Sequence, residues 1–166
     1  MPGCGKTTIG CRAAALLGAA FVDLDDRIVA VEGKTIPEIF EESGEAGFRA
    51  IETRILGDIA DAVGAAGGEA YGRGLICSAG GGIVTRPENR ALLEKIGRII
   101  FIYRDLDEIA ASVTYDASRP LLRDPAAISV LWEERRSLYR AWADREFINE
   151  GDPEKAAAQL AKIIAG

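Results

Sequence analysis

The first eight residues constrain the fold more than any other stretch of this chain. Gly5-Lys6-Thr7 fills the last three places of the phosphate-loop pattern, which reads Gly, four residues, then Gly-Lys-Ser/Thr. In such a loop, small residues let backbone N–H groups turn toward phosphate oxygens, and the helix that follows points its positive end at them. The first glycine of the pattern would fall one residue ahead of Met1. Residues 1–8 therefore predict a phosphate loop that opens a helix.

The chemistry of the loop indicates a nucleotide and a divalent cation. Lys6 is expected to reach the β- and γ-phosphates of ATP, and the Thr7 hydroxyl is expected to bind Mg²⁺. The nucleotide would be held by Gly3, Cys4, Gly5, Lys6, Thr7 and Thr8. The alternative is a glycine-rich helix start that carries Lys-Thr by chance. Apolar spacing through Ile9, Ala13, Leu16 and Leu17, ending at Gly18, predicts one buried helix face and favours the loop.

A phosphate loop normally leaves the carboxyl end of a buried strand, and this chain has no residues ahead of the loop to form it. About five apolar residues, each worth roughly 1.5–3 kcal/mol, would be absent from the sheet. That loss is comparable to the stability of a whole domain, roughly 5–15 kcal/mol. We therefore expect the natural protein to start upstream, with Met1 an internal residue of the loop and the first central strand missing from this chain.

Composition narrows the class of protein. The chain has 166 residues, of which 48% are hydrophobic and 28% charged, as expected for one globular domain spanning residues 1–166. The net charge of -6 argues against nucleic-acid and membrane-surface partners. With no histidine, acid–base chemistry must come from carboxylates. Three scattered cysteines predict reduced thiols, and we expect a cytoplasmic monomer.

The hydrophobic pattern alternates between strands and helices. This alternation predicts an α/β fold with a parallel sheet covered by helices on both faces. Strands are expected at 20–22, 75–79, 98–103 and 147–148, and helices at 9–17, 35–43, 45–63, 87–96, 106–113, 126–143 and 153–165. We expect a substrate-binding segment at about 24–52 and a lid at about 114–125 that carries Arg119.

Charged residues and glycines follow several of these elements. Asp23 ends a strand and is followed by Asp25 and Asp26, so these acids either face the phosphate loop or cap a helix. Arg49 and Glu52 are neighbours on one helix, either as a site pair or as an exposed ion pair. Three successive glycines, Gly80, Gly81 and Gly82, favour close approach of backbone to a ligand. Arg135 lies on a later helix, where surface solvation is the simpler interpretation.

Taken together, these motifs resemble the shikimate kinase family of phosphate-loop kinases, which are of the nucleoside-monophosphate-kinase type. The resemblance covers nearly the whole chain. It rests on Gly3-Cys4-Gly5-Lys6-Thr7, Asp23-Leu24-Asp25, Gly44-Glu45 followed by Phe48-Arg49 and Glu52, Gly80-Gly81-Gly82, Arg119-Pro120-Leu121-Leu122, and Arg135 four residues before Tyr139.

The resemblance implies transfer of the ATP γ-phosphate to the 3-hydroxyl of shikimate, a step toward chorismate and the aromatic amino acids. It implies that Asp25 binds the shikimate hydroxyls and takes the proton, and that Asp23 orients water on Mg²⁺. It further implies that Arg49 and Arg135 bind the carboxylate and that Gly80, Gly81 and Gly82 offer N–H groups to the ring hydroxyls. Arg119 would close onto the phosphates, so Lys6, Asp25 and Arg119 form the expected catalytic set.

Two other functions remain open at this point. One is a related small-molecule kinase such as a gluconate kinase, which shares the phosphate loop and sheet. The other is an inactive nucleotide-binding remnant. Ser112 stands where the family often has an arginine that packs on adenine, which leaves the nucleotide preference open.

Overall fold

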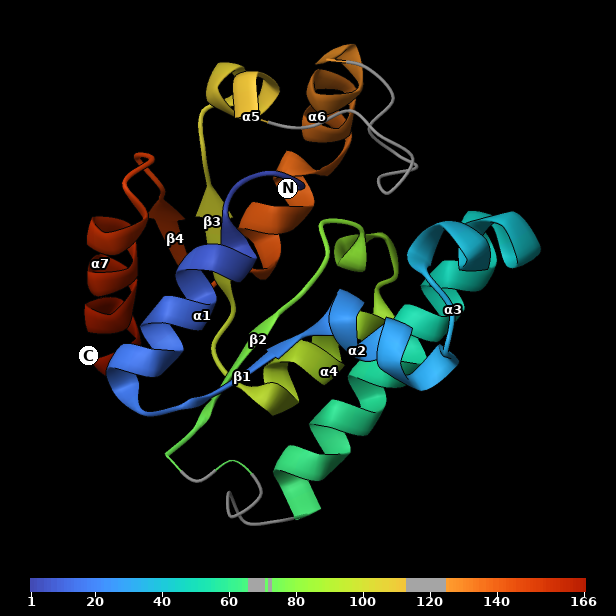
Figure 1. Ribbon diagram of the computed structural model, residues 1–166, viewed down its shortest axis with the longest axis horizontal. Helices are drawn as coiled ribbons and strands as arrows, with labels where there is room; N and C mark the ends of the chain where they lie inside the picture. Colours follow the sequence, from blue (N-terminus) through green and yellow to red (C-terminus); the bar gives the residue numbers. More distant parts are fainter. Residues whose placement is uncertain (66–70, 72, 113–124) are drawn as a thin grey trace.

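The fold is an α/β arrangement of short parallel strands and longer helices (Figure 1). The structure, a computed structural model, describes residues 1–65, 71, 73–112 and 125–166. In chain order the elements are α1 (Lys6–Leu17), β1 (Ala20–Asp23), α2 (Leu24–Glu32), α3 (Ile36–Ala65), β2 (Leu75–Ser78), a 3-10 turn η2 (Ile83–Thr85), α4 (Glu88–Ile96), β3 (Ile100–Tyr103), α5 (Leu106–Ser112), α6 (Pro125–Trp142), β4 (Arg145–Ile148) and α7 (Pro153–Ala165).

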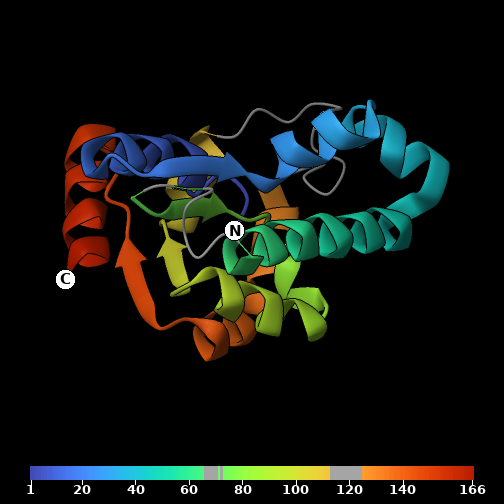
Figure 2. The same cartoon turned by 90° about the horizontal axis from the view of Figure 1, so that it is seen from below.

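The strands form two parallel pairs. β1 pairs with β2 so that Val22 lies opposite Cys77, and β3 pairs with β4 so that Ile102 lies opposite Phe147. In the part of the chain that the structure describes, β2 and β3 each pair along one edge only. Helices α1 and α7 pack together beside one face, while α3 and α4 pack together on the opposite side (Figure 2). The predicted parallel sheet with helices on both faces is confirmed.

Local sequence signals explain three of the helix boundaries. Gly18 adopts a left-handed conformation with φ 65° and ends α1, as predicted. Thr35 and Glu38 form a reciprocal capping box, in which the Glu38 carboxylate accepts from the Thr35 N–H at 2.7 Å. Gly44, with φ 66° and ψ -174°, interrupts α3 where a helix stop was expected. The predicted boundaries at these positions are therefore correct.

Two details differ from the sequence predictions. Helix α2 was not predicted; it forms because the Asp23 side chain accepts a hydrogen bond from the Asp25 N–H at 3.0 Å and so caps the helix. Leu16 was expected on the buried face of α1 but is 64% exposed. Ile9, Ala13 and Ala14 supply the buried face instead, so small residues carry more of the contact than the apolar pattern suggested.

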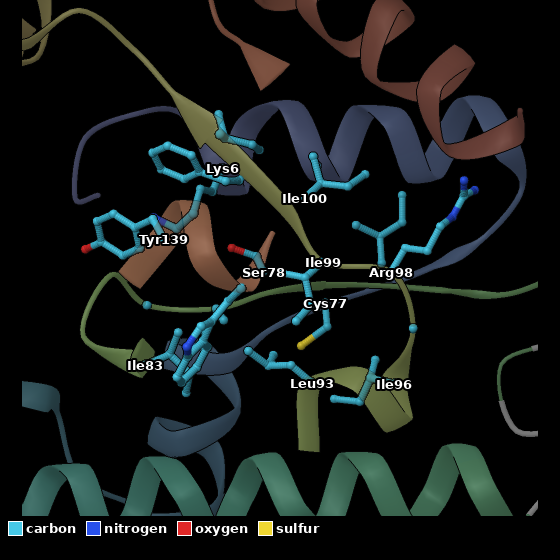
Figure 3. A pocket seen from close by; sticks show the side chains of 18 of the residues that line it. Lys6, Cys77, Ser78, Ile83, Leu93, Ile96, Arg98, Ile99, Ile100 and Tyr139 are labelled. Carbon is cyan, nitrogen blue, oxygen red and sulfur yellow. The ribbon is translucent and has the colours of Figure 1, made fainter. Parts of the chain in front are cut away.

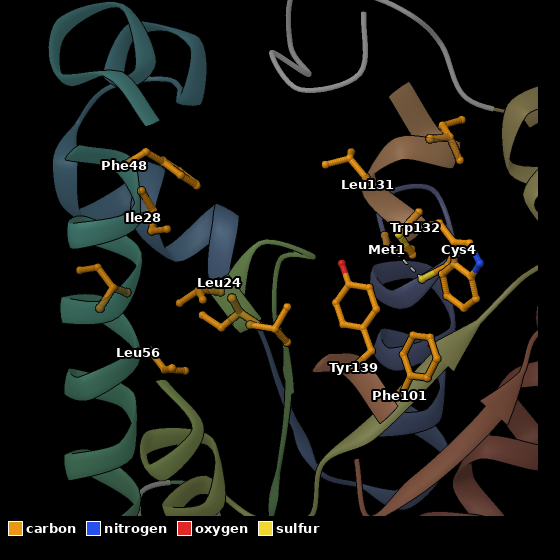
Figure 4. Close-up of a cluster of buried hydrophobic side chains, with 14 of the residues drawn as sticks. Met1, Cys4, Leu24, Ile28, Phe48, Leu56, Phe101, Leu131, Trp132 and Tyr139 are labelled. Atoms are coloured by element: carbon orange, nitrogen blue, oxygen red, sulfur yellow. Dashed lines mark hydrogen bonds between the residues drawn. The ribbon is translucent and has the colours of Figure 1, made fainter. Parts of the chain in front are cut away.

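Two apolar clusters hold the helices to the strands. The larger combines side chains from α2, α3 and α6 with Phe101 of β3 (Figure 4). Within it, the Phe101 ring stacks on Tyr139 with centroids 5.2 Å apart. The smaller cluster joins α1 and α7 through Ile9, Phe147 and Leu160. None of the helices in the described ranges has the length and apolar character needed to cross a membrane.

The two leucines Leu56 and Leu16 give a matched test of this core. Leu56 is fully buried in α3, whereas Leu16 is largely exposed in α1. Leu56→Ala should lower the free energy of unfolding by about 2–5 kcal/mol because it removes buried methyl groups and leaves a cavity. Leu16→Ala should change it by no more than about 0.5 kcal/mol. Urea denaturation followed by circular dichroism measures both; equal losses would contradict the described packing.

Candidate active site

The phosphate loop forms a turn of backbone ahead of α1. Gly3 and Gly5 both have positive φ, 73° and 88°, which side-chain-bearing residues rarely adopt. No side chain caps the start of α1, so its first N–H groups are available to an anion. The Lys6 ammonium donates to the Met1 carbonyl at 3.0 Å and thus lies folded over the loop. This geometry is that of an anion cradle with a cation above it.

The predicted metal residues contact one another at the mouth of the loop. The Thr7 hydroxyl donates to a carboxylate oxygen of Asp23 at 2.7 Å. Both groups offer oxygen, the ligand atom that Mg²⁺ prefers. Within the described ranges, His, Cys, Asp and Glu side chains form no metal-binding group of three or more. A cation here would therefore need phosphate or water oxygens besides Thr7 and Asp23, which suits Mg²⁺ bound with a nucleotide.

The Asp25 carboxyl lies near the Gly80 backbone and has a perturbed acidity. A Cβ at Gly80 would lie 3.7 Å from its Oδ1 atom. Desolvation of the carboxyl raises the pKa of Asp25, and the negative charge of Asp23 raises it further. The positive charges of Lys6 and Arg49 act in the opposite direction without cancelling the rise. Although the residue as a whole is exposed, its carboxyl group therefore lies among the charged groups of the site.

Arg49 and Glu52 form a buried ion pair on α3. The guanidinium donates to Glu52 at 2.7 Å, and the two side chains are 8% and 0% exposed. The alternative of an exposed pair is therefore wrong. The Nε atom of Arg49 and the Oε1 atom of Glu52 are buried and have no hydrogen-bond partner among the described residues. Burying charged groups with unused hydrogen-bonding positions is costly, so the pair presents a donor and an acceptor suited to a polar ligand.

The three glycines after β2 allow this pair to approach the backbone. A Cβ at Gly80 would lie 2.9 Å from Glu52 Oε1, and one at Gly82 would overlap the Arg49 guanidinium. At Gly81 a Cβ would lie 3.2 Å from the Tyr139 hydroxyl. We predicted close approach of backbone to a ligand; the structure shows close approach of backbone to the charged side chains of the site.

Helix α6 brings Tyr139 to the same glycines and carries Arg135 one turn earlier. The Tyr139 hydroxyl donates to the Gly81 carbonyl at 2.6 Å, and burial raises the pKa of Tyr139 to about 12. Arg135 is buried and its charge acts on Tyr139 and on Glu52. Solvation of Arg135 at the surface, the simpler interpretation of the sequence, is therefore wrong. Arg135 and Tyr139 are four residues apart on α6, so the helix turn that carries Arg135 lies next to the one that contacts Gly81.

These contacts bring Lys6, Asp25, Arg49 and Arg135 around one site. Lys6 and Arg49 both act electrostatically on Asp25, and Arg135 acts on Glu52, the partner of Arg49. Arg119 lies outside the described residues, as does the predicted lid apart from Pro125, the first residue of α6. The structure thus places the phosphate loop, the acids and two of the arginines together.

Sequence reasoning missed Asn149 as a residue of the site. Asn149 directly follows β4, is buried, and donates from its side-chain amide to the Cys4 carbonyl at 2.9 Å. Its oxygen accepts from the Gly151 N–H at 3.1 Å, which fixes the amide orientation. Asn149 therefore anchors the phosphate loop to the end of β4. The only available signal was its position at the carboxyl end of a strand.

The fold and the site together define the class of protein: a phosphate-loop kinase that acts on a small anionic acceptor. Residues 2–165 match the family model described as shikimate kinase. Shikimate kinase of Synechococcus elongatus is 41% identical over 98% of this chain and 82% of its own, and that of Acinetobacter baylyi is 37% identical over 98% and 87%. The chain belongs to the shikimate kinase family.

Solved structures agree with this assignment. A shikimate kinase from Acinetobacter baumannii in complex with shikimate has a TM-score of 0.86 and 32% identity, covering 98% of this chain and 88% of that one. A shikimate kinase from Aquifex aeolicus has a TM-score of 0.80 and 29% identity, covering 100% and 93%. The family and the kinase class predicted from the sequence are confirmed, and gluconate kinase and an inactive remnant are not favoured.

Substitutions of Lys6 and Asp23 should move the titration of Asp25 in opposite directions. Because Lys6 lowers the pKa of Asp25, Lys6→Met should raise the pH at which the carboxyl loses its proton. Because Asp23 raises that pKa, Asp23→Asn should lower it. Carbon-13 NMR of the side-chain carboxyl measures each titration without requiring activity. Shifts in the same direction would contradict the described electrostatics.

Gly82 and Gly57 give a matched test of the glycine packing. Gly82 has φ -86°, which alanine adopts freely, and the nearest atoms that a Cβ in Gly82→Ala would meet are those of the Arg49 guanidinium. The guanidinium must move, and binding of the acceptor should weaken roughly 10-fold or more, since a lost hydrogen bond to a charged group costs about 1.5–3 kcal/mol. Gly57, in α3, has open space around it, so Gly57→Ala should leave binding unchanged. Isothermal titration with shikimate distinguishes the two variants; equal affinities would count against the packing.

Proposed function

We propose that this protein transfers the γ-phosphoryl group of ATP to the 3-hydroxyl of shikimate. The observation that supports this most is the buried Arg49–Glu52 pair with its unused donor and acceptor, lying beside Asp25. A small acceptor that carries a carboxylate and several hydroxyls supplies the complementary groups. The shikimate named in the Acinetobacter baumannii complex has this chemistry.

The proposed binding of ATP uses the loop before α1. Backbone N–H groups of residues 3–8 would hold the phosphates, and Lys6 would leave the Met1 carbonyl to contact them. Arg119 would add positive charge from the lid. Thr7 and Asp23 would hold Mg²⁺, Asp23 through water; when bound, this cation neutralises charge that develops on the phosphates.

The proposed binding of shikimate uses the opposite wall. Arg49 and Arg135 would hold its carboxylate, since two guanidinium groups compensate for taking a small anion out of water. Gly80, Gly81 and Gly82 would offer backbone N–H groups to the ring hydroxyls, and Glu52 Oε1 would accept from one of them. Residues 24–52 would form the substrate-binding segment of a single domain.

Asp25 is the proposed acceptor of the hydroxyl proton. Phosphoryl transfer depends mainly on in-line positioning and charge stabilisation. A carboxylate whose pKa is raised is a stronger base than an ordinary one, provided that it stays ionised at the working pH. Lys6, Asp25 and Arg119 would therefore act on the reacting atoms. The proposal includes a cytoplasmic monomer whose partners are shikimate and ATP.

A coupled assay of ADP release tests the function, and Arg135 and Arg136 test the carboxylate site. The chain should release ADP with shikimate but not with gluconate.

Arg135→Ala should weaken shikimate binding roughly 10- to 100-fold, because a charged hydrogen bond is worth about 1.5–3 kcal/mol. The affinity for ATP should fall much less, since the phosphates are proposed to be held by the backbone N–H groups of the loop and by Lys6, without Arg135.

Arg136 is the matched control for Arg135. It is the next residue on α6, pairs with Glu133 at 3.0 Å, and its side chain is 49% exposed. Arg136→Ala should leave both affinities unchanged, because an exposed ion pair contributes little. If the two variants lose shikimate affinity equally, or if Arg135→Ala weakens ATP as much as shikimate, the assignment of the carboxylate site is wrong.

A further inference from the structure

Asn149 is a buried asparagine between the phosphate loop and the end of β4. Its side chain donates to the Cys4 carbonyl at 2.9 Å and accepts from the Gly151 N–H at 3.1 Å. Its own backbone N–H donates to the carbonyl of Tyr103, the last residue of β3, at 2.8 Å. With an exposed fraction of 5%, the residue has little freedom to move. Asn149 therefore ties the loop to the ends of two paired strands.

The bond from Asn149 fixes the direction of one peptide group in the loop. The Cys4 carbonyl belongs to the same peptide as the Gly5 N–H, and in a trans peptide these two groups point in opposite directions. The described residues contain no cis peptide bond. Because Asn149 holds the carbonyl on its own side, the Gly5 N–H points away from Asn149. In a phosphate loop, backbone N–H groups turned in this way are the ones that bind phosphate oxygens.

The loop is packed against Asn149 and borders a cavity elsewhere. A Cβ at Gly5 would lie 2.7 Å from Asn149 Nδ2, so the glycine and the amide are in direct contact. Met1 and Lys6, by contrast, belong to the lining of a cavity of about 270 Å³ (Figure 3). Atoms that face empty space gain no packing energy there. The shape of the loop therefore depends strongly on its contact with Asn149.

Two further side chains that donate to the loop backbone belong to the loop itself. The Cys4 thiol donates to the Met1 carbonyl at 3.1 Å, and the Lys6 ammonium donates to the same oxygen at 3.0 Å (Figure 4). A thiol is a weak donor, and Lys6 would leave Met1 to contact the phosphates. The bond from Asn149 to the Cys4 carbonyl involves neither of these donors, so it can persist when a nucleotide binds.

We propose that Asn149 is a positioning residue for the nucleotide, which holds the Cys4–Gly5 peptide so that the Gly5 N–H faces the phosphates of ATP. This inference rests on the proposed binding of ATP at the loop and does not depend on which acceptor receives the phosphoryl group. Asn149 acts through the loop and does not contact the reacting atoms. Without its amide the loop samples other shapes, and the affinity for ATP falls with the fraction of molecules that keep the binding shape.

Asn149→Ala and Asn89→Ala give a matched test. Asn89 is also buried, and its amide donates to a backbone carbonyl at 2.9 Å, but that carbonyl belongs to Ile83 in η2. Asn149→Ala should weaken binding of ATP and ADP roughly 5- to 100-fold, because the Cys4 carbonyl loses its partner. Its affinity for shikimate, and the nucleotide affinity of Asn89→Ala, should stay within about twofold. Isothermal titration measures these affinities, and equal nucleotide affinities for the two variants would overturn the proposal.

Hydrogen exchange in the unmodified chain tests the same role without a substitution. When ADP binds, exchange of the Asn149 side-chain amide, followed by NMR, should slow at least about fivefold, because the loop and the amide open together. The Asn89 side-chain amide should respond much less. An Asn149 amide that ADP leaves unchanged would overturn the proposal, even if Asn149→Ala did not fold. Binding of ADP without ADP release from ATP and shikimate would instead count against the proposed function alone.

Discussion

The site depends on one constraint: the carboxyl ends of all four strands meet at the same edge. Parallel strands impose this, because each connection must cross back over a face of the sheet before the next strand begins. The phosphate loop, Asp23, the glycines after β2 and Asn149 are far apart in sequence, yet each lies just beyond a strand or against its end. Short strands of four residues are sufficient, since their role is to bring these ends together.

The charged side chains of the site are placed by helices, and the glycines decide how close they come. Arg49 and Glu52 project from α3 and lie against Gly82 and Gly80, and the charge of Arg135 on α6 acts on Glu52. Burying this pair is expensive unless its remaining hydrogen-bonding positions are used. In a chain of net charge -6, two buried arginines this close to the phosphate loop favour an anionic ligand.

The fold class and the positions of most helices and strands could be predicted from the sequence. Glycines, capping boxes and apolar runs mark where these elements begin and end, and they can be recognised from neighbouring residues alone. Gly18, Gly44 and the Thr35–Glu38 box ended or began helices where expected. Helix α2 was missed because its acidic first turn reads equally well as a ligand-binding loop, and the cap that forms it is visible only once Asp23 is placed. Burial of the Arg49–Glu52 pair and the anchoring by Asn149 depend on tertiary packing, which no local pattern encodes.

The absence of histidine makes the balance of charges around Asp25 decisive. A carboxylate in water is a weak base at neutral pH, and burial alone would strengthen it at the risk of leaving it protonated. Here desolvation and Asp23 raise its pKa while Lys6 and Arg49 limit the rise. The same lysine is the expected partner of the ATP phosphates. The charge that most limits the rise at Asp25 therefore belongs to the side chain that is proposed to contact the nucleotide.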